Sequence, residues 1–118
     1  GKKPIPFDKL LVATGARPKK LGVVGETLDN IFSLRSANDH YQIQSRAKNA
    51  KDIVIVGSGF IGLESAIALK KAYPKKNVTI ITSTMYPMQE LYGPQIGERL
   101  QKLHEANGIK FLTAQKVE

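Results

Sequence analysis

The chain of 118 residues contains no cysteine. This absence excludes a disulfide framework, a thiolate zinc site and a dithiol redox relay within these residues. Long apolar runs are missing too, because runs such as Ile53–Val56 are far shorter than the roughly 20 residues that a helix needs to cross a bilayer. The sequence therefore predicts no membrane span and no reaction that begins on a local thiol.

Acidic residues are few relative to basic ones: 10 Asp and Glu stand against 18 Lys and Arg, which gives a formal net charge of +8. A basic chain attracts acidic partners, and DNA binding through this charge would weaken steeply with salt. The basic residues, however, are spread as pairs along the whole chain, a pattern more typical of a solvated surface. We therefore do not expect nucleic acid to be a partner.

Three short segments rich in apolar and β-branched residues are predicted strands: Ile53–Val56, Val78–Thr82 and Ile109–Ala114. The first is a continuous β-branched run, which is typical of a central parallel strand covered on both faces. Helix-like sequence follows it to about Ala72, and a second helix is predicted between Gly93-Pro94 and Gly108. This order over residues 51–118 predicts an α/β fold, the βαβαβ half of a Rossmann-like three-layer nucleotide-binding domain with a parallel central sheet.

The beginning of the chain carries weaker signals. Phe7–Thr14 contains an apolar run and is followed by Gly15 and Pro18, which predicts a short buried strand that a tight turn ends. We expect residues 1–22 to be the end of one structural unit together with the crossover into the next.

Residues 23–50 are predicted to form a connection and an edge helix. Ser36, followed three residues later by Asp39, has the form of a capping box, in which side-chain oxygens accept from the free amides at a helix start. The helix is predicted to run to about Lys48, and its weak apolar face indicates packing at an edge.

Three glycines between the first strand and the next helix match a dinucleotide-binding fingerprint: Gly57, Gly59 and Gly62. Gly57 permits a tight turn, Gly59 lets the backbone approach a pyrophosphate, and Gly62 allows close contact between helix and strand. The helix directs its unpaired amides and positive dipole end toward the pyrophosphate. A lone glycine pattern is weak evidence, but the strand before it and the helix after it favour dinucleotide binding over a purely structural turn.

One element of the fingerprint is missing, namely the acidic residue that holds the adenosine ribose at the end of the second strand. Thr82 stands in its place, and Thr82, Ser83 and Thr84 offer hydroxyls to the ribose instead of a carboxylate, so Thr82 is expected to contact the cofactor. Between Lys76 and Arg99 no basic residue is present to pair with a 2′-phosphate. The sequence therefore favours NAD(H) over NADP only by default.

Three segments in this order resemble the FAD-dependent pyridine nucleotide-disulfide oxidoreductases, in the branch of the ferredoxin reductases and apoptosis-inducing-factor-like proteins: Phe7–Pro18, Ile31–Ser36 and the glycine fingerprint. The resemblance covers nearly the whole chain. It implies that residues 1–22 end the first segment of an FAD-binding domain and that residues 51–118 bind NAD(P)H.

The resemblance also implies roles for single residues near the flavin. Thr14 and Gly15 would lie beside FAD where the chain crosses into the nucleotide domain, and Arg17 follows them. Arg35 would contact the phosphate region of the flavin cofactor. A solvated surface charge is the alternative interpretation for both arginines.

On the nucleotide side, the resemblance implies that Phe60, Ile61 and Gly62 line the path of the dinucleotide and that Glu64 lies by the nicotinamide. In the intact protein, hydride would pass from NADH to FAD, and electrons would pass on to an iron–sulfur or other acceptor. His40 and His104 have no companion at ligand or nucleophile spacing, so no catalytic or metal residue is assigned.

We expect the chain to be a part of a longer flavoprotein, or a remnant that a partner subunit completes, because the flavin fingerprint of the family is not among these residues. FAD would then be held only by the intact protein, and the chain alone would be inactive. The alternative is a noncatalytic structural or interaction module that keeps the nucleotide-binding fold, which the threonine at position 82 favours.

Overall fold

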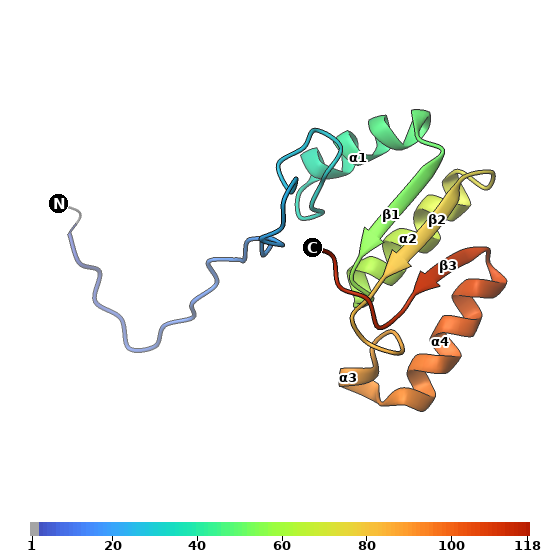
Figure 1. Ribbon diagram of the computed structural model, residues 1–118. Helices are drawn as coiled ribbons and strands as arrows, with labels where there is room; N and C mark the ends of the chain where they lie inside the picture. Colours follow the sequence, from blue (N-terminus) through green and yellow to red (C-terminus); the bar gives the residue numbers. More distant parts are fainter. Residues whose placement is uncertain (1–2) are drawn as a thin grey trace.

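The computed structural model describes residues 3–118 and is built around a three-stranded parallel sheet (Figure 1). The strands are β1 (Asp52–Val56), β2 (Asn77–Ile81) and β3 (Ile109–Leu112). The helices are α1 (Ala37–Asn49), α2 (Phe60–Ala72), α3 (Gln89–Tyr92) and α4 (Pro94–Ala106). The strands pair in the order β1-β2-β3. The predicted α/β class with parallel strands in βαβαβ order is therefore confirmed.

The hydrophobic core lies between one face of the sheet and the two crossover helices. Val78 and Ile80 of β2 are fully buried, and Leu63 and Ala66 of α2 join them in one cluster. Leu100 of α4 packs against the same cluster. Because side chains alternate between the faces of a strand, α2 and α4 cover the same face of the sheet.

β1 is an edge strand among the described residues, so the prediction of a central strand covered on both faces is wrong for this structure. Ile53 and Ile55 face the core, whereas Val54 and Val56 point the other way and are 57% and 45% exposed. A β-branched run fits a strand buried on one face as well as on two, and the pattern alone does not decide between them. Within residues 3–118, only β2 has a neighbour on each side.

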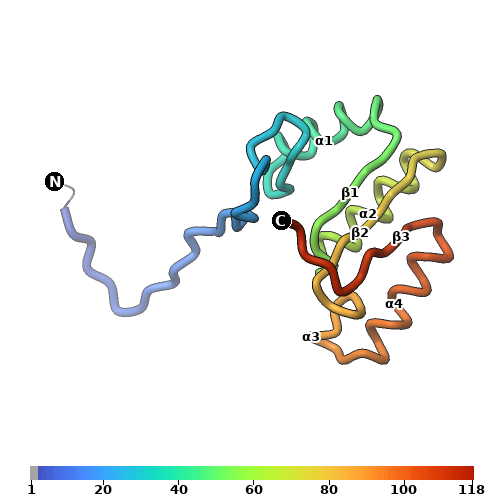
Figure 2. Tube along the Cα trace, in the orientation of Figure 1, coloured from blue at the N-terminus to red at the C-terminus, as the bar shows by residue number. Residues whose placement is uncertain are grey.

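The predicted strand at Phe7–Thr14 is also wrong, because the chain has no regular structure before Ala37 within the described residues. Leu10, Leu11 and Val12 are 66%, 87% and 71% exposed. A strand needs a hydrogen-bonding neighbour, and the start of the chain extends away from the sheet (Figure 2). The extended segment helps to explain the principal extents of 56 × 36 × 29 Å.

The predicted start and end of α4 are confirmed. Gly93 and Pro94 open α4, and Gly108, at φ +78°, follows its last turn. Proline at the first helical position and a glycine beyond the last are the usual ends of a helix. The single turn α3 was not predicted, because its four residues are too few to show a period.

α1 forms as the capping box predicts and attaches to the sheet unit through side chains beyond α2. The Ser36 hydroxyl accepts from the amide of Asp39 at 3.3 Å, and the Asp39 carboxylate accepts from the amide of Ser36 at 2.8 Å. At the other end of the helix, the Lys76 ammonium donates to the carbonyls of Lys48 and Ala50. A cation placed there satisfies free carbonyls and complements the helix dipole.

The cap gives α1 a pH dependence. The amide of Ser36, its hydroxyl and the amide of Arg35 all stabilise the Asp39 carboxylate and lower its pKa. A carboxyl whose pKa is lower in the folded state stabilises that state above its unfolded pKa, and the contribution is lost as pH falls through the folded pKa. We expect NMR amide signals of the first turn of α1 to move toward unfolded values only below about pH 4.

Asp39→Asn is the matched control, because its first-turn signals should change little over the same pH range. A carboxyl of Asp39 that titrates at its ordinary value, followed by its own side-chain signal, would show that the cap does not form in solution.

Candidate functional site

The glycine turn joins the end of β1 to α2, at the carboxyl edge of the sheet. The amide of Gly57 donates to the carbonyl of Ile81 at 2.8 Å, which carries the pairing of β1 and β2 into the turn. Gly57 then adopts φ +103°, which only glycine adopts readily. A Cβ on Gly62 would overlap the Gly57 carbonyl oxygen and would lie 3.6 Å from Ile55 Cγ2. The first and third glycines therefore let α2 pass directly against the turn.

The N-terminus of α2 faces open space. Gly59 is its N-cap residue with no side-chain cap, and a Cβ there would meet nothing within 4 Å. The first helical bond runs from the amide of Leu63 to the carbonyl of Gly59 at 3.0 Å, so the amides of Phe60 and Ile61 have no partner within the helix. Free amides and the positive dipole end make this opening suitable for an anionic group such as a pyrophosphate.

The other predicted residues on α2 are accessible. Phe60 and Ile61 are 56% and 63% exposed, and Glu64 is exposed on the next turn. The Phe60 ring meets the ring of Tyr92, the last residue of α3, edge to face with centroids 6.2 Å apart. Tyr92 was not singled out from the sequence, because no pattern brings a residue 32 positions away onto the helix start.

Thr82 follows β2 directly, but it is buried and its hydroxyl is already bonded. Ser58 donates to Thr82 Oγ1 at 2.8 Å, and Thr82 Oγ1 lies 2.9 Å from Thr84 Oγ1. The Thr84 hydroxyl in turn donates to the carbonyl of Tyr86 at 2.8 Å. Ser58 and Thr82 are 7% and 5% exposed. We name these three side chains, Ser58, Thr82 and Thr84, the hydroxyl chain.

Ser58 was given no role from the sequence, although it lies inside the fingerprint. A serine between two glycines carries no signal of its own, because its partner stands 24 positions away. The hydroxyl chain links the glycine turn to the residues after β2, so it also fixes how the two strand ends meet.

The four residues that the resemblance assigns to the flavin side all precede α1, in the part of the chain without helices or strands. Thr14, Arg17 and Arg35 are exposed. Gly15 has φ +78°, and a Cβ there would lie 3.8 Å from the Arg35 guanidinium. The structure thus brings Gly15 and Arg35 together, but it does not enclose them.

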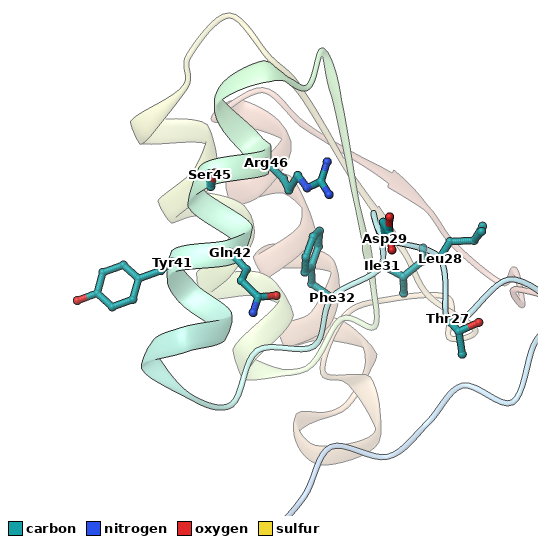
Figure 3. Close-up of a pocket in the computed structure, with 9 residues that line it drawn as sticks. All are labelled: Thr27, Leu28, Asp29, Ile31, Phe32, Tyr41, Gln42, Ser45 and Arg46. Atoms are coloured by element: carbon teal, nitrogen blue, oxygen red, sulfur yellow. The ribbon is translucent and has the colours of Figure 1, made fainter.

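A hollow of about 650 Å³ lies elsewhere, between α1 and the loop before it (Figure 3). Phe32 and Arg46 line it, whereas the ring of Tyr41 points away from it. None of the fingerprint residues borders this hollow. It is therefore separate from the site at the glycine turn.

Other kinds of site are not indicated in the described part of the chain. Among residues 3–118, no group of three or more His, Asp and Glu side chains could hold a metal ion. His104 is buried, with Nδ1 2.8 Å from the carbonyl of Leu100 and its ring against Phe111, so it belongs to the core. No helix in the same residues is long and apolar enough to cross a membrane.

A family model described as pyridine nucleotide-disulphide oxidoreductase matches residues 1–118. Apoptosis-inducing factor 3 from Homo sapiens is 32% identical over 108 residues, covering 91% of this chain and 17% of that protein. Rubredoxin-NAD(+) reductase from Acinetobacter baylyi is 32% identical over 115 residues, covering 96% and 29%. A solved covalent putidaredoxin reductase–putidaredoxin complex is similar with TM-score 0.82 and 28% identity, covering 95% and 27%. The chain spans less than a third of the length of each.

The hydrogen bond between Ser58 and Thr82 predicts that their substitutions have coupled effects on the free energy of unfolding. Thr82→Val keeps the shape of the side chain but leaves the buried Ser58 hydroxyl without its acceptor, which should lower the free energy of unfolding by about 1–3 kcal/mol. Ser58→Ala combined with Thr82→Val should cost less than the sum of the single changes, because the Ser58 hydroxyl that loses its acceptor in Thr82→Val is then absent. Urea unfolding of the four proteins measures this coupling.

Thr79→Val is the matched control, since Thr79 lies in the middle of β2, the strand that ends just before Thr82, and away from the glycine turn. Strictly additive costs of the Ser58 and Thr82 changes would mean that the two hydroxyls are not coupled in solution.

Proposed function

The chain belongs to the pyridine nucleotide-disulphide oxidoreductase family, as the resemblance in its sequence indicates, and on that premise we propose that residues 51–118 bind a nicotinamide dinucleotide at the glycine turn. The proposal extends to the intact protein, which we infer to be an FAD-dependent NAD(P)H oxidoreductase. The chain itself supplies the nucleotide-binding part, which the fold and the fingerprint support together.

The observation that carries the proposal is the opening above Gly59. Backbone can approach a ligand here without obstruction, while Gly62 and Gly57 hold α2 close behind it. A helix start with free amides is suited to a pyrophosphate, and a strand–turn–helix context distinguishes it from an ordinary glycine turn. The residues present therefore fit a dinucleotide, which would lie over the turn with its pyrophosphate at the amides of Phe60 and Ile61.

The exposed side chains of α2 extend the proposed site beyond the pyrophosphate. Phe60 and Ile61 would line the path of the dinucleotide, and Glu64, one turn further, would lie by the nicotinamide. Their exposure leaves them free for contact. When both cofactors are bound, the nicotinamide supplies a hydride and the flavin accepts it; the task of this chain is to bind and orient the donor.

On the flavin side, we propose that Thr14, Gly15, Arg17 and Arg35 meet FAD in the intact protein. The approach of the Arg35 guanidinium to Gly15 supports a shared role for two positions that stand 20 residues apart. These side chains are exposed and form no closed cradle by themselves. We therefore propose that FAD also needs residues from the rest of the flavoprotein or from a subunit that supplies them.

The electron acceptor is proposed from the relatives. One is named as a rubredoxin-NAD(+) reductase and another is solved in complex with putidaredoxin. By analogy, we propose that the intact protein passes electrons to an iron–sulfur protein or a comparable redox acceptor. NADH oxidation with such an acceptor by the full-length protein measures this step.

A second candidate function is a noncatalytic module that keeps the nucleotide-binding fold. The observation in its favour is Thr82, which is buried and bonded where the fingerprint expects an acid. A full-length protein that holds no flavin and does not oxidise NADH would support the module, whereas a yellow, active protein would reject it.

Substitutions at Gly59, the N-cap of α2, and at Gly62 within α2 test nucleotide binding and folding stability separately. Gly59→Ala adds a methyl group in open space, so it should change the free energy of unfolding by less than about 1 kcal/mol while it blocks the pyrophosphate and weakens NADH binding about tenfold or more. Titration of NADH fluorescence measures the affinity, and the absence of tryptophan from the chain keeps the background low.

Gly62→Ala is the companion variant, because its methyl group would overlap the Gly57 carbonyl and should cost at least about 2 kcal/mol of stability. A Gly59→Ala protein that binds NADH as tightly as the unchanged chain would contradict the proposed position of the pyrophosphate.

A further inference from the structure

The hydroxyl chain uses every hydroxyl proton that it contains. Ser58 donates to Thr82, and Thr84 donates to the carbonyl of Tyr86, which leaves the proton of Thr82 for the 2.9 Å contact with Thr84. The amide of Thr84 also points at Thr82 Oγ1, at 3.3 Å. A hydroxyl that accepts two hydrogen bonds and donates one has no capacity left for a ligand.

The place after β2 is where dinucleotide-binding folds carry the residue that reads the adenosine ribose. A carboxylate there accepts from the ribose hydroxyls and repels a 2′-phosphate, whereas a nearby arginine accommodates the phosphate. Thr82 does neither, because it is neutral, buried and fully bonded. Along the sequence, the nearest basic residue before it, Lys76, is engaged with the end of α1, and the next one is Arg99. The fold brings one more basic residue close to this place, because the amide of Gln115, next to Lys116, donates to the carbonyl of Thr82 at 3.0 Å.

We propose that the nucleotide site does not discriminate between NADH and NADPH, and that Thr82 is the residue responsible. This inference rests on the proposed dinucleotide site and adds its substrate range. It replaces the expectation of NAD(H) by default: a threonine in place of the carboxylate does not repel the 2′-phosphate, and its bonded, neutral hydroxyl does not attract the phosphate either. The pyrophosphate contacts at Phe60 and Ile61 are common to both nucleotides.

The test compares the two nucleotides on the same chain by fluorescence titration. The dissociation constants of NADH and NADPH should agree within about threefold, since Thr82 brings neither a carboxylate nor a cation to the 2′ position. Thr82→Glu should then favour NADH over NADPH by about tenfold relative to the unchanged chain, through ribose hydrogen bonds and repulsion of the 2′-phosphate. Thr82→Gln, of equal size and no charge, is the matched control and should leave the ratio near its original value.

Thr82 is buried, so thermal unfolding of the Glu and Gln variants is measured first. If both fail to fold, Ser83→Glu and Ser83→Gln replace them, because Ser83 is exposed and adjacent. A Glu variant whose ratio of NADH to NADPH affinity equals that of its Gln control would overturn the role proposed for the residues that follow β2.

The failure of this inference can be told apart from the failure of the proposed function. A chain that binds one nucleotide more than about tenfold tighter than the other still binds a dinucleotide, but it overturns the lack of discrimination. A chain that binds neither nucleotide at millimolar concentration overturns both proposals.

Discussion

The close passage of α2 over the end of β1 is the constraint on which the rest of this structure depends. Gly57 turns the chain at φ +103°, and Gly62 lacks the Cβ that would overlap the Gly57 carbonyl. This passage sets Ala66 fully buried against the sheet and directs the free amides of α2 outward above Gly59. The packing of the core and the chemistry of the site therefore follow from the same two glycines.

The parts of the fold that could be predicted from sequence are those set by local stereochemistry. The capping box at Ser36, the proline at the start of α4 and the glycine turn each act within a few residues, so the sequence contains their whole cause. Strand order has a different origin, because β1 reads as a central strand but forms an edge. The predicted strand at Phe7–Thr14 is wrong for the same reason: an apolar run becomes a strand only where a neighbouring strand can pair with it.

In the site, too, local features could be predicted and long-range contacts could not. The glycines and the helix start could be predicted, because their spacing is local, whereas the bond between Ser58 and Thr82 joins positions 24 residues apart. The sequence predicts that the hydroxyl of Thr82 faces the ribose of a bound dinucleotide. In the structure its hydroxyl bonds Ser58 and Thr84 and so connects the residues after the second strand to the glycine turn.

The central claim is that a dinucleotide binds at the start of α2. Backbone amide shifts of the isotope-labelled chain during an NADH titration test it most directly. The account predicts saturable shifts largest at Gly59, Phe60 and Ile61 and small shifts around the hollow beside α1. Shifts that are concentrated at Phe32 and Arg46, or that are absent from the glycine turn, would contradict it.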